Sequence, residues 1–141
     1  MVIITNLIWI DSDYDNQENT EYLKDLKDYN FLKIKCFKEV NDALNKIKQI
    51  EFEETIIIVS GILYSTFIEI FKESLKDIFI IPKIIIFTKN KETFIENNKN
   101  YNNFINHPFY NLGGIKTSFN EVKQFLLNPI NKKILNMMKA N

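Results

Sequence analysis

The sequence predicts a single α/β domain in which helices cover both faces of a five-stranded, mostly parallel sheet. Two observations lead to this prediction. Three isoleucine-rich runs, 2–10, 55–59 and 82–87, carry almost no charge, as expected of central parallel strands covered on both faces. Amphipathic segments with helical spacing alternate with these runs, and such alternation is typical of a parallel sheet with crossover helices.

The second predicted strand, 31–37, differs from the others because lysines alternate with apolar residues along it. Lys33 and Lys35 would point to one face, and Leu32, Ile34 and Cys36 to the other. A strand with one solvated face belongs at the edge of a sheet. This placement fits the strand order 2-1-3-4-5 of the flavodoxin-like three-layer sandwich.

Helices are predicted after each of the first three strands from apolar residues at helical spacing. The first spans 18–29 with Asn16 as its candidate N-cap. The second begins at Asn41, which is also a candidate N-cap, and the third spans 63–75.

The C-terminal third is less regular. Residues 91–103 form a weak, polar helix with Phe94, Ile95 and Tyr101 as anchors, and 109–115 supply the last strand. The final helix starts with a capping box, Ser118 and Glu121. Pro129 ends that helix, so we expect the α/β domain to span 1–129 and a tail helix to occupy 130–141.

Composition argues against several classes of partner. Acidic and basic residues balance at 18 each, and every basic residue is lysine, which argues against nucleic acid because phosphate recognition relies on arginine. The longest apolar runs fall short of the roughly 20 residues of a membrane span. The single cysteine, Cys36, is expected to be a small buried side chain, and with no signal peptide the chain is expected in the cytoplasm or nucleus.

Polar side chains follow four of the predicted strands. In open parallel sheets the functional site lies beyond the carboxyl ends of the strands. The residues found there are Asp11, Ser12 and Asp13 after the first strand, Ser60 after the third, Thr88 after the fourth and Lys116 after the fifth.

This pattern resembles the receiver domain of response regulators over residues 7–127. Receivers hold Mg²⁺ with an acidic pair after the first strand, which Asp11 and Asp13 approximate, although Ser12 takes the second of two usually adjacent positions. The resemblance matches Thr88 and Lys116 to the receiver hydroxyl and lysine, while Thr117 replaces the usual proline after that lysine.

Ser60 is the decisive departure, because it stands where receivers carry the phosphate-accepting aspartate. A serine hydroxyl cannot form an acyl phosphate, and it removes one metal-binding carboxylate. The resemblance therefore implies a phosphorylation-incompetent pseudo-receiver, a non-enzymatic module that binds a protein partner or another domain of a larger protein. No cofactor is expected, and Asp11 and Asp13 are the weak candidates for a Mg²⁺ site. A homodimer is compatible with this role.

An enzymatic alternative is a Mg²⁺-dependent phosphatase of the haloacid dehalogenase type. The run 8–13 resembles the first motif of that family, which would make Asp11 the nucleophile and Asp13 the general acid. Ser60 and Lys116 would then correspond to the second and third motifs. The chain lacks a later acidic pair after a strand to complete the metal site.

Purely structural roles form the third alternative, including an oligomerisation domain. Asp11 and Asp13 would then solvate a strand end or cap the next helix, and Lys116 would pair with Asp11. An apolar stretch that leads into the last strand is the candidate partner surface, although the same aromatics would also serve to fill the core; it contains Phe104, His107, Phe109 and Tyr110.

Overall fold

A five-stranded sheet forms the centre of the computed structural model, which describes residues 4–74, 82–99 and 111–127. Each neighbouring pair of strands is parallel, and the order is β2-β1-β3-β4-β5. The predicted flavodoxin-like fold class and strand order are therefore confirmed. The strands are β1 (Thr5–Ile10), β2 (Leu32–Phe37), β3 (Thr55–Ser60), β4 (Lys83–Phe87) and β5 (Asn111–Lys116).

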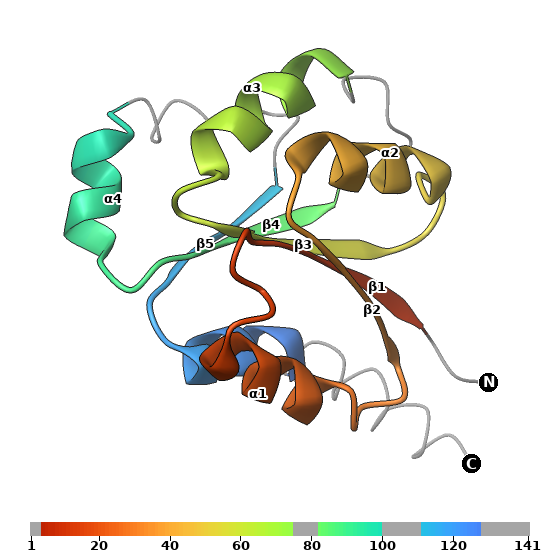
Figure 1. Ribbon diagram of the computed structural model, residues 1–141. Helices are drawn as coiled ribbons and strands as arrows, with labels where there is room; N and C mark the ends of the chain where they lie inside the picture. Colours follow the sequence, from red (N-terminus) through yellow and green to blue (C-terminus); the bar gives the residue numbers. More distant parts are fainter. Residues whose placement is uncertain (1–3, 75–81, 100–110, 128–141) are drawn as a thin grey trace.

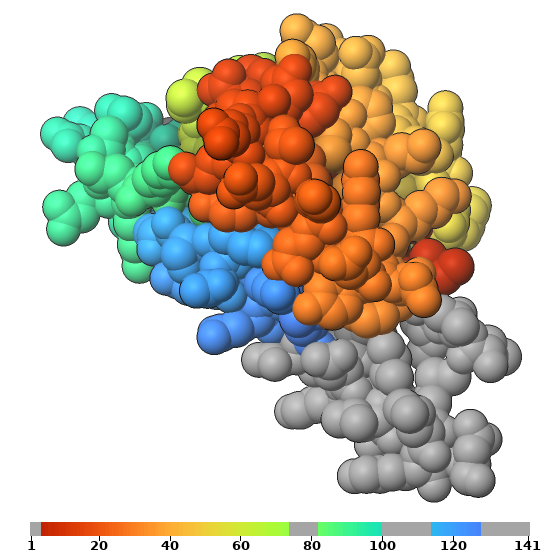
Figure 2. All heavy atoms as spheres, turned by 60° about the horizontal axis from the view of Figure 1, so that its bottom comes forward, coloured from red at the N-terminus to blue at the C-terminus, as the bar shows by residue number. Residues whose placement is uncertain are grey.

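Helices cover both faces of the sheet (Figure 1). On one face lie α2 (Val40–Gln49) and α3 (Tyr64–Ser74), with α4 (Lys91–Asn97) beside α3. The other face carries α1 (Gln17–Leu26) and a helical segment over 119–127. Figure 2, which looks onto this second face, shows α1 and the chain around 119–127 side by side. Within the described residues no helix is long and apolar enough to cross a membrane.

Two hydrophobic cores lie on either side of the sheet because the central strands bury both of their faces. In β1, Ile8 and Ile10 belong to the core beneath α2 and α3, whereas Leu7 and Trp9 belong to the core beneath α1. Every residue of β1 is buried. Alternate side chains of a strand point to opposite faces, so the part of β1 that packs against both cores is apolar, and the buried polar residues Thr5 and Asn6 lie at the start of the strand.

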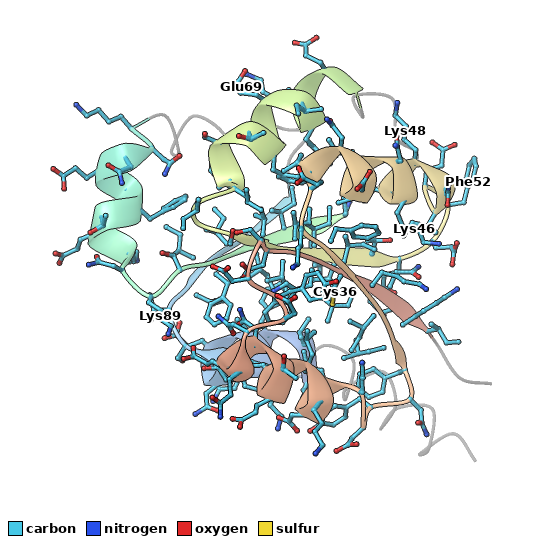
Figure 3. All side chains as sticks on the ribbon, viewed as in Figure 1. Cys36, Lys46, Lys48, Phe52, Glu69 and Lys89 are labelled. Atoms are coloured by element: carbon cyan, nitrogen blue, oxygen red, sulfur yellow. The ribbon has the colours of Figure 1, made fainter. Side chains whose placement is uncertain are left out.

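The edge position of β2 is also confirmed. Lys33 and Lys35 are exposed, whereas Leu32 is buried and Cys36 is partly buried. Figure 3 shows Cys36 between the sheet and the α1 layer. Lysines on an open edge discourage pairing with a strand of another molecule, because such pairing would desolvate their charges.

Helix starts agree with the sequence at two sites and differ at a third. The Asn16 side chain caps α1 by accepting a hydrogen bond from the Asn19 amide at 2.8 Å, as predicted. Ser118 likewise accepts from the Glu121 amide at 3.3 Å. The prediction for Asn41 is wrong, since α2 already begins at Val40. Val40, the first residue of α2, is buried in the core beneath α2 and α3, so the helix begins before Asn41. Asn41 lies exposed in its first turn.

The helix predicted over 91–103 is shorter in the structure, ending at Asn97. Phe94 is buried as expected, but Ile95 is 42% exposed, so its prediction as an anchor is wrong. A helix of two turns buries only a narrow stripe, and Ile95 lies beside that stripe. Tyr101 lies outside the described residues.

The last strand contains a bulge that its glycines make possible. Ile84 pairs with Leu112 and Ile85 pairs with Gly114, so Gly113 is the extra residue. Gly114 has a φ of 94°, a conformation that side chains with a Cβ rarely adopt. The predicted tail helix over 130–141 lies outside the described residues, as does the candidate partner surface of Phe104, His107, Phe109 and Tyr110.

Candidate functional site

The carboxyl ends of the strands bring the predicted site residues to one edge of the sheet. Backbone hydrogen bonds continue beyond the strands and align the segments that follow them. The Asp11 amide donates to the Phe37 carbonyl at 2.9 Å, and the Thr88 amide donates to the Lys116 carbonyl at 3.0 Å. Gly61, directly after Ser60, donates to the Phe87 carbonyl at 3.2 Å.

Asp11 organises the loop between β1 and α1. Its Oδ1 accepts a hydrogen bond from the Asp13 amide at 2.8 Å, and its Oδ2 accepts one from Asn19 Nδ2 at 3.4 Å. The same Asn19 amide donates to the Asp13 carbonyl at 2.9 Å. Ser12 and Asp13 are exposed. These bonds are those of an Asx turn that leads into a helix, which is a structural use of the carboxylate.

The Asp11 carboxyl is partly buried, and this burial raises its pKa above the ordinary value. The nearby Asp13 charge acts in the same direction, whereas hydrogen bonds from the Asp13 backbone and the Trp9 side chain oppose it. The folded chain therefore binds more protons than the unfolded chain between the unfolded and folded pKa values of Asp11. Its free energy of unfolding falls as the pH rises through this window.

We therefore predict that Asp11→Asn stabilises the fold at neutral pH. Asparagine has no charge to desolvate and keeps an acceptor for the Asp13 amide, but its NH₂ group cannot accept the long hydrogen bond that Asn19 Nδ2 donates at 3.4 Å. The expected gain is small, about 0.5 kcal/mol, because solvent screens a half-exposed carboxyl. Urea unfolding at pH 7 measures it, and the gain should disappear below the unfolded pKa of aspartate. Asp28→Asn, at an exposed position, is the control. Equal loss of stability at both pH values would contradict the burial argument.

Ser60 ends β3 and turns its hydroxyl onto its own chain. Its Oγ accepts a hydrogen bond from the Leu63 amide at 3.4 Å, and its carbonyl accepts from the same amide at 3.1 Å. Leu63 directly precedes α3, so Ser60 helps to satisfy an amide that the helix itself leaves unpaired. The side chain thus serves the turn between β3 and α3.

Lys116 contacts an aromatic ring. Its Nζ lies 5.6 Å from the centre of the Phe125 ring, in the helical segment 119–127. The three ion pairs among the described residues include neither Asp11 nor Lys116, so the structural pairing of these two residues is not formed.

Two ion pairs join segments at this edge, and in one of them Lys38 Nζ lies 2.9 Å from Asp15 Oδ2. In the other, Lys89, in the turn after β4, reaches Glu18 of α1 with 2.9 Å between Nζ and Oε2, and Tyr22 donates to the other oxygen of Glu18 at 2.9 Å. Figure 3 shows Lys89 at the junction between the β4–α4 turn and the α1 layer. The hydrogen bond with Lys89 is the main cause of the lowered pKa of Glu18. Because both partners are largely exposed, the pair orients the turn more than it stabilises the fold.

The donor set fits Mg²⁺ poorly. This ion prefers near-octahedral oxygen ligands, usually one or two carboxylates together with waters, and the carboxylates must be free to bind it. Both oxygens of Asp11 already accept hydrogen bonds, Asp13 is exposed, and Ser60 replaces a carboxylate. Across 4–74, 82–99 and 111–127 no three acidic, histidine or cysteine side chains are grouped so that they could hold a metal.

Thr88 is the predicted site residue that lines a cavity. This cavity has a volume of about 350 Å³ and lies between the β3–α3 turn, the β4–α4 turn and α4. We call it the α3–α4 cavity. Its polar lining consists of Ser65, Thr88, Asn90, Thr93, Asn97 and Asn98. Sequence reasoning missed five of these six residues. The sequence did contain an indication of a polar turn here, because Asn90, a good capping residue, follows shortly after the strand-end residue Thr88. In the structure Asn90 caps α4.

Cys36 is not a nucleophile candidate in this structure. Burial raises the pKa of its thiol, which favours the less reactive protonated form. The thiol packs at the margin of the core beneath α1, and Cys36 is only partly buried, whereas we expected a buried side chain.

Comparison with known proteins adds no relative, since no protein family, curated protein or solved structure matches the chain.

Proposed function

We propose that the chain is a receiver-like binding module without aspartyl-phosphate chemistry, which recognises a protein partner or another domain of a larger protein. The observation that carries this proposal is Ser60. It lies at the carboxyl end of the central strand β3, the position of the phosphate acceptor in receivers, and its hydroxyl accepts from the Leu63 amide. A residue used in this way supports a turn.

Two neighbouring side chains support the same proposal. In the resemblance to receivers, the lysine after the last strand would assist at the acidic site, but Lys116 lies against Phe125 instead. Asp11 favours its protonated form more than an ordinary aspartate does, because of its burial. A raised carboxyl pKa weakens metal binding, which needs the ionised form.

The phosphatase alternative requires an ionised Asp11 as nucleophile and Asp13 as a general acid within reach of the same substrate. In the structure Asp13 contacts Asp11 through its backbone amide, and its side chain is exposed. This geometry favours the binding module over the enzyme.

The chemical half of the proposal is tested with a phosphate donor. The purified chain is incubated with acetyl phosphate and Mg²⁺, and its intact mass is measured beside an active receiver domain as the positive control. We expect a phosphoryl adduct on the control alone. Titration with Mg²⁺ and beryllofluoride should leave the fluorescence of Trp9 unchanged, although Trp9 lies two residues from Asp11. A saturable fluorescence change, or an adduct on this chain, would refute the proposal.

The enzymatic alternative is tested in the same preparation. Hydrolysis of a phosphomonoester with Mg²⁺ that is lost in Asp11→Asn would establish the phosphatase instead. The matched control is Asp15→Asn, because Asp15 lies on the same loop but pairs with Lys38 at 2.9 Å. Its substitution should leave any such activity in place.

The binding half is tested on a partner identified by crosslinking in the source cells and then purified. Its affinity is measured with and without acetyl phosphate and Mg²⁺. We expect the dissociation constant to change by less than about twofold, whereas a phosphorylation-dependent module would show a change of about tenfold or more, equivalent to about 1.4 kcal/mol.

A further inference from the structure

The α3–α4 cavity is independent of the acidic residues at the end of β1. Its volume of about 350 Å³ falls within the range of roughly 300–1,000 Å³ found for small-molecule sites. Figure 1 shows α4 set beside the end at which α3 begins, and the turns after β3 and β4 close the space between them. It therefore occupies the carboxyl side of the sheet, where α/β proteins of this topology bind ligands.

Among the residues that the structure describes, those lining the cavity include no ionisable side chain. Because the site is open and these residues are neutral, an anion or cation placed there would find no opposite charge to pair with. An uncharged molecule needs no such partner. Because the described lining is uncharged, it favours a neutral ligand over a charged one.

Several polar groups of the lining are not bonded to the described residues of the protein, and Ser65, Thr93 and Asn97 are exposed to solvent. Within the described part of the chain, the hydroxyls of Ser65, Thr88 and Thr93 make no hydrogen bond, and neither does the Asn97 side chain. A hydroxyl and a carboxamide can each donate and accept. They complement a molecule that itself carries several hydroxyl groups.

Two further amides are each half used. Asn90 Oδ1 accepts from the Thr93 amide at 2.9 Å, which leaves its NH₂ group as a donor. Asn98 Nδ2 donates to the Phe94 carbonyl at 2.8 Å, which leaves its oxygen as an acceptor. Because these bonds hold both side chains to α4, the remaining donor and acceptor have defined directions.

The apolar part of the lining argues against a nucleobase. Phe94 is buried and packs edge-on against Tyr64, with ring centres 5.3 Å apart, so its face is not open for stacking. Bases bound by proteins usually stack on aromatic faces. Ile62, which is 85% exposed, lies at the rim and can cover only a small aliphatic surface.

We propose that the α3–α4 cavity binds a small, uncharged, polyhydroxylated molecule of about the size of a monosaccharide. This inference does not depend on the receiver resemblance or on a protein partner. It assigns a ligand site to the hydroxyls and amides of the β4–α4 region.

The test is a titration of the ¹⁵N-labelled full chain followed by amide chemical shifts. The neutral probes are D-glucose, D-ribose and myo-inositol, and the comparison probes are adenosine, acetate and inorganic phosphate. We expect saturable shifts with at least one neutral polyol, centred on the amides of Gly61, Thr88 and Thr93. A few hydrogen bonds in an open site should yield a dissociation constant on the order of 1–10 mM.

A blocking variant and its matched control make the result specific. Ser65→Trp places bulk in the cavity and should weaken binding about tenfold or more. Thr66→Trp places the same bulk on the next exposed residue, which does not line the cavity, and should leave binding unchanged. The dispersion of the amide spectrum reports whether each variant is folded.

Three outcomes would overturn the proposal. The first is the lack of a saturable shift with all three polyols up to about 100 mM, well above the expected dissociation constant. The second is polyol binding that persists unchanged in folded Ser65→Trp. The third is tighter binding of phosphate, acetate or adenosine at the same amides, which would assign the cavity to a charged or aromatic ligand.

Discussion

Replacing Trp9 with alanine is expected to lower the free energy of unfolding by about 3–5 kcal/mol. Trp9 is fully buried in β1, between Cys36 of β2 and Ile58 of β3. Its ring meets that of Phe87 edge-on at 6.0 Å, so it also joins β1 to β4 through the core beneath α1. Alanine would leave a cavity that the neighbouring strands cannot close, because the sheet holds them apart.

Domains of this size have a free energy of unfolding of about 5–15 kcal/mol, so this one substitution would remove a large part of it. Urea unfolding followed by far-ultraviolet circular dichroism measures the loss without relying on the tryptophan signal. Trp9→Phe keeps an aromatic ring and should cost less than Trp9→Ala. Phe52→Ala is the matched control, since Phe52 is 67% exposed and its loss should change stability by about 0.5 kcal/mol or less. Similar values for Trp9→Ala and Phe52→Ala would contradict the buried position of Trp9.

Gly61→Ala is expected to cost about 1–3 kcal/mol through a steric clash. A Cβ at residue 61 would lie 2.9 Å from Thr88 Cβ and 3.0 Å from Thr88 Oγ1. These atoms belong to a short, β-branched side chain next to the backbone, so they cannot move away without shifting the turn after β4. Close approach of the two turns, and not a left-handed backbone conformation, therefore requires glycine at this position.

A double-mutant cycle tests this cause. Thr88→Gly removes both clashing atoms, so Gly61→Ala should cost less in that background, with an interaction energy of about 1 kcal/mol or more. Gly114→Ala provides the contrast. Its φ of 94° predicts a backbone cost of about 1–2 kcal/mol, and no atom lies within 4 Å of the added Cβ. Thr88→Gly should not relieve that cost. Additive effects of Gly61→Ala and Thr88→Gly would rule out the clash.

Local sequence patterns were sufficient to predict the sheet. The continuous apolar runs of β1, β3 and β4 correspond to strands buried on both faces. The alternation of Lys33 and Lys35 with apolar residues correctly placed β2 at the edge, because only an edge strand can keep two lysines solvated. The Asn16 cap was also predictable, since it depends on a contact three residues away.

Patterns failed where burial overrides a local preference. Asn41 is a good capping residue, yet α2 already starts at Val40. The side chain of Val40 is buried, and this burial favours a helix that begins one residue earlier. Ile95 is apolar and was therefore predicted to be an anchor, but in the short helix α4 its side chain is exposed to solvent. In both cases the orientation of a helix against the sheet decided the outcome, and this orientation has no local signature in the sequence.

The sequence by itself determined the α/β class, the strand order, the edge strand and the set of polar residues at the carboxyl ends of the strands. Only the tertiary structure decided what those residues do. It directs Lys116 onto Phe125 and places Thr88 in the α3–α4 cavity, whereas Asp11 and Ser60 accept hydrogen bonds from amides only two and three residues further along the chain. It also assembles the α3–α4 cavity from turns that are distant in the chain. The physical reason is that strand formation depends on residues that are neighbours in sequence, whereas the direction of a polar side chain depends on which donors, acceptors and rings packing brings within reach.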